Sequence, residues 1–278
     1  MTTSEWSLLK SWDVIYVEQL ADAKVARLVL NRPDKRNAMS PQLMANFQDA
    51  LEFIRGQDSI SVVITKGAGP VYCAGQDLHG LKATREGPLE DWDRPQPSTR
   101  LYNAVRLFPK IMIAQIHGYC LGGAVALLNS HDLAVVAENA QIGMPEILRG
   151  SFGMNVTATL YHSNIAYKKA ALLQLSGRNI TGREADELGI VSMAVAEDEL
   201  EETTTQLARE ISMRHPQALR HAKAAVDLGR DVPLTHAMEI DRLLTIRMRL
   251  EVDPLDNLDN YLDSQRGGTN TEYVRADL

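Results

Sequence analysis

The chain has few cysteines, and they are not arranged as metal ligands. Cys73 and Cys120 are the only two in 278 residues, and each lies within an apolar segment. Neither belongs to a CxxC pair or a histidine-rich cluster, the spacings that metal sites need. We therefore expect two buried, free thiols and no metal site.

Long hydrophobic runs are also missing. The best candidate, Met112–Asp132, is interrupted by His117, Asn129 and His131, so it falls short of the ~18 uninterrupted apolar residues of a membrane span. The N-terminal sequence MTTSEWSLLKSWD lacks the charged start and apolar core of a signal peptide. These absences predict a soluble, cytoplasmic protein with no membrane partner.

An excess of positive charge is absent as well. The formal net charge is −7, which argues against nucleic acid as the main partner, although local basic patches remain free to bind phosphates. The hydrophobic fraction of 45% is sufficient for a substantial core. Length and composition together predict one large α/β domain or a domain with an appendage.

The order of strands and helices predicts a parallel-rich sheet. A helix begins at Ser40-Pro41 and reaches Gly56. The turns Tyr72–Asp77 and His117–Gly123 both follow strands, and sites form at the carboxyl ends of such strands, so we expect these turns to meet in one crevice. Short β-branched or apolar runs predict strands at Val14–Gln19, Lys24–Asn31, Ile60–Thr65, Ile111–Ile116 and Asp132–Ala137.

The C-terminal third of the chain predicts mostly helix. Thr181 and Glu184 form a capping-box pattern that opens a short helix ending at Gly189. We divide the chain into a core over residues 1–197 and a helical C-terminal region over residues 198–278. Longer helices are predicted at Leu200–Met213, Pro216–Leu228 and Leu234–Leu250.

The most informative segment reads IAQIHGYCLGGAVALLNSHD, in which an apolar strand, a turn with adjacent glycines and an apolar helix follow one another. Gly122 and Gly123 let a ligand approach the backbone. The free N–H groups at the start of the helix would hold a developing negative charge. This arrangement predicts an oxyanion hole.

Four segments together resemble the crotonase (enoyl-CoA hydratase/isomerase) superfamily: LNRPDKRNAMS at 30–40, YCAGQDL at 72–78, HGYCLGGAVAL at 117–127 and GMPEILRG at 143–150. The resemblance implies an α/β fold, a spiral of repeated β-β-α units followed by a helical C-terminal region for trimerisation or cover. It also implies an acyl-CoA substrate, no cofactor besides the coenzyme A of that substrate, and a homotrimer or a dimer of trimers.

By the family pattern, the backbone N–H groups of Gln76 and Gly123 bind the thioester carbonyl oxygen and stabilise its enolate. Glu146 matches the second catalytic glutamate of the family, which implies a general acid and base. Its neighbours Met144 and Ile147 are apolar, so we expect desolvation to raise its pKa. The alternative is a glutamate that is merely paired at the end of a loop.

The resemblance places Lys35 and Arg36 in a loop beside the nucleotide of coenzyme A, where their charges suit phosphates. Taken singly, each is equally consistent with a solvated loop charge. The aromatic residues Tyr72, Trp92 and Tyr102 either line the acyl pocket or pack in the core. The other substrate-binding positions that the resemblance implies are Ala38, Ala74, Asp77, Leu78, Tyr119, Gly122 and Ala126.

One position departs from the hydratase pattern. Hydratases of this family carry a further glutamate three residues after the second glycine of the hole, where this chain has Ala126. Without that residue, a clamp of two carboxylates on a water molecule is missing. We therefore expect isomerisation of an enoyl-CoA first. Hydration or an aryl hydratase-lyase reaction is the alternative, if another residue replaces the glutamate.

The polar stretch from Lys82 to Thr99 is expected to be a mobile cover for the site, and its Asp91 and Asp93 are the candidates for that replacement. The turn that follows Glu146 in sequence reads SFGMNVTATL at 151–160 and is bulkier than in hydratases, which predicts an altered acyl pocket. Two other functions stay open: hydrolysis of a carbon–carbon bond in a diketone, and acyl-CoA binding without catalysis.

Histidine and aspartate near the glycine turn suggest a catalytic triad, but the spacing argues against it. His131 and Asp132 are neighbours in sequence, and adjacent side chains on a helix diverge. We expect Asp132 to be a structural residue at a helix end or turn. His117 is expected to hydrogen-bond to nearby backbone.

Overall fold

The computed structural model describes residues 6–78, 96–163 and 165–251. Asp91, Trp92, Asp93 and most of the polar stretch lie outside these residues. By its internal contacts the chain divides into two units, one ending at Arg214 and the other beginning at His215. The sequence boundary at residue 197 stays a prediction.

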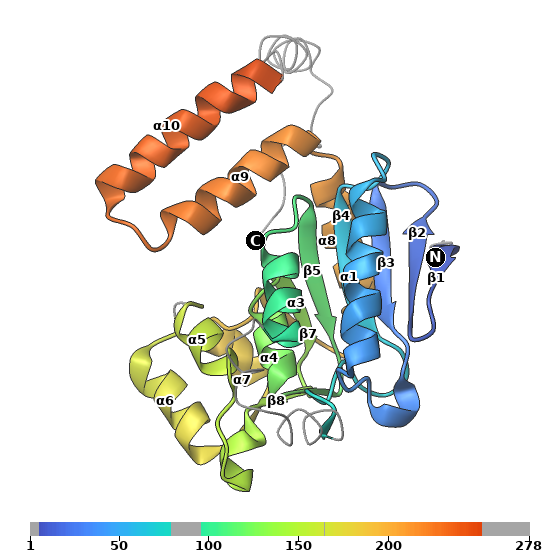
Figure 1. The fold of residues 1–278 in the computed structure, drawn as a ribbon, viewed down its shortest axis with the longest axis vertical. Coiled ribbons are helices and arrows are strands. Elements are labelled where there is room, and N and C mark those ends of the chain that lie inside the picture. Colours follow the sequence, from blue (N-terminus) through green and yellow to red (C-terminus); the bar gives the residue numbers. More distant parts are fainter. Residues whose placement is uncertain (1–5, 79–95, 164, 252–278) are drawn as a thin grey trace. The chain divides into compact units, whose positions relative to one another are not determined.

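A seven-stranded sheet lies at the centre of the first unit, in the order β1-β2-β3-β4-β5-β7-β10 (Figure 1). β1, β2 and β3 pair antiparallel, whereas the pairs from β3 to β10 are parallel. The predicted parallel-rich sheet is therefore confirmed. Its strands are β1 (Trp6–Ser11), β2 (Ile15–Leu20), β3 (Val25–Leu30), β4 (Val62–Gly67), β5 (Ile111–Ile116), β7 (Leu133–Ala137) and β10 (Met193–Val195).

Helices cover both faces of this sheet. The helix predicted after Ser40 is α1, and the Oγ of Ser40 caps it by accepting from the N–H of Leu43 at 3.2 Å. α1 packs beside α3 on one face, and α8 packs on the other face against β3, β4, β5 and β7 (Figure 1). The helices named here are α1 (Pro41–Arg55), α3 (Pro97–Arg106) and α8 (Leu200–Ser212).

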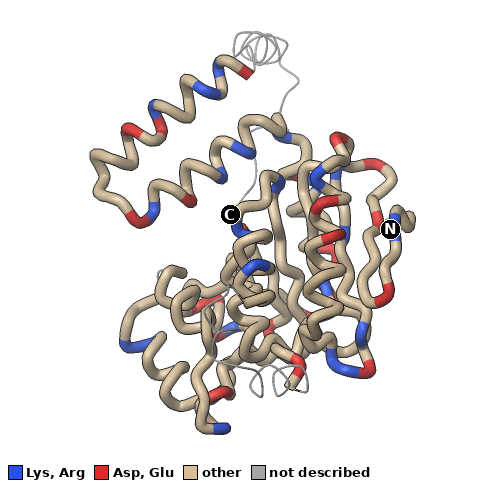
Figure 2. Tube along the Cα trace, viewed as in Figure 1, with Lys and Arg blue, Asp and Glu red and all other residues tan. Residues whose placement is uncertain are grey.

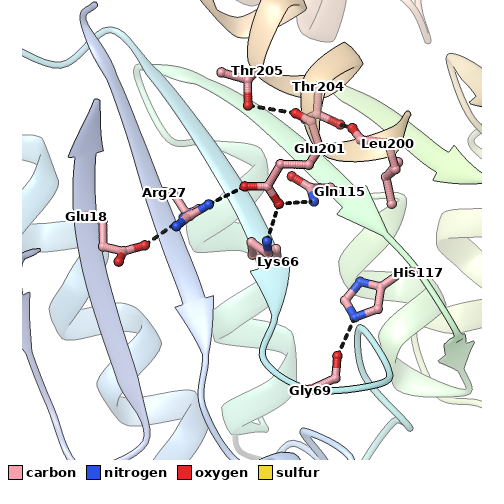
Figure 3. A network of polar contacts seen from close by, with 10 residues as sticks. All are labelled: Glu18, Arg27, Lys66, Gly69, Gln115, His117, Leu200, Glu201, Thr204 and Thr205. Carbon is pink, nitrogen blue, oxygen red and sulfur yellow. Dashed lines mark hydrogen bonds and ion pairs between the residues drawn. The ribbon is translucent and has the colours of Figure 1, made fainter. Parts of the chain in front are cut away.

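An ion network attaches the first turn of α8 to the sheet (Figure 3). The Oε1 atom of Glu201 lies 2.5 Å from Nη1 of Arg27, which also pairs with Glu18 at 2.7 Å. The other oxygen of Glu201 accepts from Nζ of Lys66, and from Nε2 of Gln115 at 3.2 Å. This carboxylate is thus satisfied by three donors from three strands.

A smaller sheet carries the elements closest to the candidate site. It consists of β6 (Tyr119–Leu121), β8 (Gln141–Gly143) and β9 (Asn179–Thr181), in the order β6-β8-β9. Thr181 and Glu184 form the predicted capping box. The other described helices of this unit are η1 (Pro33–Lys35), α4 (Gly123–Leu128), η3 (Pro145–Arg149), α5 (Val156–Tyr161), α6 (Tyr167–Ser176) and α7 (Gly182–Glu187).

The second unit contains α9 (Pro216–Gly229) and α10 (Leu234–Glu251), which pack against each other and confirm the predicted helices. Acidic and basic residues are interspersed along α10 (Figure 2). Several large apolar side chains on these helices, including Leu234 and Leu250, are exposed. No helix in the described part of the chain is long and apolar enough to cross a membrane.

Candidate active site

Two glycine-containing turns run side by side at the carboxyl ends of β4 and β5. The N–H of Tyr72 donates to the carbonyl of His117 at 2.9 Å, and the N–H of Cys73 donates to Tyr119 at 3.0 Å. The N–H of Leu121 returns a bond to the carbonyl of Cys73 at 3.1 Å. This short ladder confirms that the turns Tyr72–Asp77 and His117–Gly123 meet.

The ladder brings the peptide of Gln76 beside the peptide of Gly123. A β-carbon added at Gly75 would lie 3.4 Å from the nitrogen of Gly123 and 2.5 Å from the carbonyl oxygen of Leu121. Gly75 also has a φ of +94°, which L-residues with side chains rarely adopt. Only glycine lets the two turns approach this closely.

Both predicted oxyanion donors are free of acceptors from the described part of the chain. Within the described residues, neither the N–H of Gln76 nor that of Gly123 donates to a protein acceptor. The N–H of Gly123 stands at the start of α4, where the first amides have no partner inside the helix. Two free amides from separate turns can therefore bind one oxygen atom that gains negative charge.

Each of these amides belongs to a peptide unit whose carbonyl already accepts a hydrogen bond. The N–H of Met39 donates to the carbonyl of Gly75 at 2.8 Å, and the N–H of Val125 donates to that of Gly122 at 2.8 Å. Chains of hydrogen bonds polarise one another. The N–H at the other end of each peptide is consequently both fixed in direction and a stronger donor.

Glu146 lies in η3 with its carboxylate against Gly122 and Gly153. A β-carbon added at Gly122 would stand 2.5 Å from Oε1 of Glu146, and one added at Gly153 would stand 3.2 Å from the same oxygen. Oε2 is buried and has no hydrogen-bond partner among the described residues. Burial raises the pKa of Glu146, against the opposing charge of Arg149. Whether Glu146 is a general acid and base or a structural carboxylate at the end of a loop stays a prediction.

The sequence model of the Enoyl-CoA hydratase/isomerase family matches residues 21–261. The chain belongs to this family. It is 32% identical to a hydroxycinnamoyl-CoA hydratase-lyase of Pseudomonas fluorescens over 215 residues, or 76% of this chain and 77% of that protein. It is 31% identical to a 2,3-dehydroadipyl-CoA hydratase of Escherichia coli K12 over 243 residues, or 87% of this chain and 93% of that protein.

Solved structures agree with the sequence match. A crystal structure of an enoyl-CoA hydratase from Bacillus anthracis superposes with a TM-score of 0.81 at 28% sequence identity. The superposition covers 91% of this chain and 97% of that protein. The predicted crotonase fold is confirmed, and with it the expectation of a family of acyl-CoA enzymes.

Within this crotonase-family fold, position 126 lies on α4, three residues after Gly123, the predicted oxyanion donor. Ala126 is fully buried. Because its side chain is a methyl group, α4 supplies no second carboxylate to the site. Asp91 and Asp93, the predicted replacements, fall outside the described residues.

Lys35 and Arg36 are exposed at the end of η1, and a buried asparagine shapes their loop. Arg36 and Asn37 both have positive φ values, 50° and 53°. The side-chain amide of Asn37 donates to the carbonyls of Ala68 and Val71 at 2.9 and 2.8 Å, and its oxygen accepts from the N–H of Arg32. This structural role of Asn37 was not predicted, although asparagine is among the residues other than glycine that most often adopt a positive φ.

The remaining predicted substrate-binding residues lie around the two turns with different exposures. Ala38 and Ala74 are half-buried and Gly122 is buried, whereas Leu78 and Tyr119 are 53% and 42% exposed. Asp77 is in an ion pair with Arg32 at 3.2 Å. Its charge is therefore committed to holding the 72–77 turn against the loop that carries Arg32.

The histidines and Asp132 are engaged in structural hydrogen bonds, as expected. Oδ2 of Asp132 accepts from the N–H of Met112 at 2.7 Å. The ring of His131 bonds to Thr65 at 2.8 Å and to the carbonyl of Leu127 at 2.7 Å. His117 bonds to the carbonyl of Gly69 at 2.9 Å (Figure 3). None of these bonds joins His131 to Asp132.

Both cysteines are buried and free, which confirms that prediction. Burial raises the pKa of Cys73 to about 12 and raises that of Cys120 as well, so neither is a nucleophile near neutral pH. Among the described residues, no group of three or more His, Cys, Asp or Glu side chains is placed to hold a metal ion.

Proposed function

We propose that the chain isomerises the double bond of an enoyl-CoA. The amides of Gln76 and Gly123 hold the thioester oxygen, and the carboxylate of Glu146 removes a proton from the α-carbon of a 3-enoyl-CoA. The electron pair of the broken C–H bond enters the dienolate. Glu146 then returns the proton to the γ-carbon, so atoms and charge balance without a redox partner.

The observation that supports this proposal is the setting of Glu146. Its carboxylate lies against Gly122, the residue next to the amide of Gly123, and one of its oxygens is buried with no hydrogen-bond partner in the part of the chain that the structure describes. A base with a raised pKa is better matched to proton transfer near neutral pH. Since position 126 is alanine, a single carboxylate performs both transfers.

We extend the proposal to the rest of the substrate. Lys35 and Arg36 bind phosphates of coenzyme A from their exposed loop, and the reaction needs no cofactor beyond the coenzyme A of the substrate. The working assembly is a homotrimer or a dimer of trimers in the cytoplasm.

Product mass tests the reaction directly. A panel of enoyl-CoA thioesters is incubated with the protein in deuterium oxide, and products are analysed by mass spectrometry and NMR. Isomerisation moves the double bond and exchanges hydrogen at the α- and γ-carbons, with no other gain in mass. Glu146→Gln should abolish both changes. Equal exchange by wild type and Glu146→Gln would remove Glu146 from this role.

Hydration, followed in aryl substrates by cleavage, is the second candidate. It is favoured by the names of the two curated relatives, a hydratase-lyase and a hydratase, each more than 30% identical to this chain. The same panel separates the candidates, because hydration adds one water to the product and lyase action releases an aldehyde fragment. Addition of water without double-bond migration would favour this candidate over isomerisation.

A further inference from the structure

We infer that Tyr102 of α3 is a positioning residue for the oxyanion hole. This inference rests on the proposed function. Its hydroxyl donates to the carbonyl oxygen of Gly123 at 3.0 Å. Gly123 is the residue whose own N–H is proposed to bind the thioester oxygen. Tyr102 therefore fixes the donor from the opposite side of the same residue, although the two are 21 positions apart in the sequence.

The packing around Gly123 gives Tyr102 this control. A β-carbon added at Gly123 would lie 2.9 Å from the hydroxyl of Tyr102, 2.9 Å from Cε of Met39 and 3.2 Å from Cγ of Gln76. The α-carbon is thus enclosed by three side chains, one of them from the residue that carries the other donor. The hydroxyl is the only polar atom of these three.

The backbone at this point needs such a restraint. Gly122 precedes the donor with a φ of +57°, and adjacent glycines have the largest conformational freedom of any pair. α4 has only six residues, so its first turn is not held by a long helix. A hydrogen bond from a different helix removes that freedom and keeps the N–H of Gly123 aimed at one place.

Tyr102 remains a donor under working conditions. It is 4% exposed, and burial raises its pKa, with the carboxylate of Glu146 acting in the same direction. A neutral phenol with its hydrogen committed to Gly123 does not move protons. Its effect on the reaction passes through the amide of Gly123.

The test measures polarisation of a bound carbonyl, which reports the hole without turnover. Butyryl-CoA with an isotopic label at the thioester carbonyl is bound to wild type and to Tyr102→Phe, and the carbonyl stretch is recorded by difference infrared spectroscopy. We expect wild type to shift the band to lower frequency and Tyr102→Phe to lose a large part of that shift. Turnover of an enoyl-CoA should fall about tenfold with KM nearly unchanged, less than the roughly 100-fold loss typical of removing a donor.

Ser130→Ala is the matched control. Ser130 follows the same helix, is buried, and its hydroxyl donates to the carbonyl of Ala126 at 2.7 Å. The Ser130→Ala variant therefore loses a similar hydrogen bond at the other end of α4. The thioester carbonyl of butyryl-CoA bound to this variant should show the same shift as in wild type. Thermal unfolding of both variants shows whether either loosens the fold.

The outcomes separate this inference from the proposed function. An unchanged carbonyl shift in Tyr102→Phe, or an equal loss in Ser130→Ala, would overturn the role of Tyr102 while leaving the hole intact. No shift in wild type would overturn the hole itself, and the role of Tyr102 with it. A selective loss in Tyr102→Phe supports the inference even if the natural reaction proves to be hydration.

Discussion

Glu146 beside the proposed oxyanion hole and Glu201 at the start of α8 are both partly removed from water, yet their surroundings differ. Glu201 accepts from Arg27, Lys66 and Gln115. Glu146 has one buried oxygen without a partner among the described residues. Desolvation acts on both carboxyls. At Glu201, hydrogen bonds and the charges of Lys66 and Arg27 outweigh it and lower the pKa, whereas at Glu146 it raises the pKa.

The difference teaches how one residue type serves two purposes. A carboxylate that is surrounded by cations stays ionised and is held in one geometry. Such a carboxylate can join elements of the fold through its ion pairs. A carboxylate with a buried oxygen that no described donor reaches has a higher affinity for a proton, a property that suits proton transfer to a substrate. The partners of each residue, not its burial, decide which role it has.

The largest expected effect comes from exchanging the proposed catalytic carboxylate for an amide. Glu146→Gln should lower turnover of an enoyl-CoA by about 100- to 10,000-fold, because the general base is lost, while acyl-CoA still binds. Steady-state kinetics and equilibrium binding measure the two quantities. In Glu201→Gln, turnover should stay within about twofold of wild type. A comparable loss of turnover in both variants would erase the proposed distinction.

A change of backbone beside Glu146 should have the next largest effect. Gly122→Ala places a β-carbon 2.5 Å from Oε1 of Glu146, so the carboxylate must move. We expect turnover to fall about 100-fold. Gly189→Ala is the control, because Gly189 also has a positive φ but a β-carbon there meets nothing within 4 Å. Equal turnover in the two alanine variants would show that contact with Gly122 does not position Glu146.

Removal of the structural carboxylate should affect stability instead of turnover. Glu201→Gln should lower the free energy of unfolding by about 1 kcal/mol, a modest value because this side chain is 46% exposed and its ion pairs are screened. Urea denaturation measures the change. Glu138→Gln, which breaks a more exposed pair with Arg183, should cost less. If the two variants were equally stable, the network would not anchor α8.

The smallest effect is the pH dependence of stability. The raised pKa of Glu146 gives a stabilising contribution that is fully present below the ordinary glutamate pKa of about 4.3 and is lost as pH rises through the folded value. The lowered pKa of Glu201 gives a contribution that is present above about 4.3 and is lost as pH falls through its folded value.

Relative to wild type, Glu146→Gln should therefore gain stability as pH rises, and Glu201→Gln should recover as pH falls. Urea denaturation across the acid range gives both curves, each spanning a fraction of about 1 kcal/mol after solvent screening. The acid limb of kcat/KM should fall with the same raised pKa as Glu146. Parallel slopes for the two variants would contradict the opposite pKa shifts.

Local signals in the sequence predicted much of the fold. Ser40 and Thr181 mark helix starts that the structure confirms, because a cap acts on amides two or three residues away. β4 was predicted at Ile60–Thr65 but spans Val62–Gly67. An apolar run in the sequence does not determine where a strand begins and ends. The bounds of β4 are set by its pairing with β3, which begins at Val25 opposite Val62 and ends at Leu30 opposite Gly67.

Other elements were missed because their signals are not local. β1 is mostly exposed and is defined by its ladder with β2. β6, β8 and β9 have three residues each, too few to show a period. α3 begins at Pro97, inside the stretch predicted as a polar loop. Contacts with α1 and α4 place it, and it carries Tyr102 to the site.

The sequence by itself contains the four ordered motifs, and these were sufficient to predict the family. The same motifs indicated Gln76 and Gly123 as the oxyanion donors to test. Because position 126 is alanine, they also indicated Glu146 as the single candidate carboxylate of these motifs. Only the tertiary structure decided three further points: the amides of Gln76 and Gly123 meet no acceptor among residues 6–78, 96–163 and 165–251, an oxygen of Glu146 is buried without a donor from these residues, and Tyr102 bonds to Gly123. A motif fixes which groups a segment offers, because that is local covalent chemistry. Whether a group stays solvated, accepts a hydrogen bond or is buried without a partner depends on segments that are distant in the chain, and only tertiary packing brings those segments together.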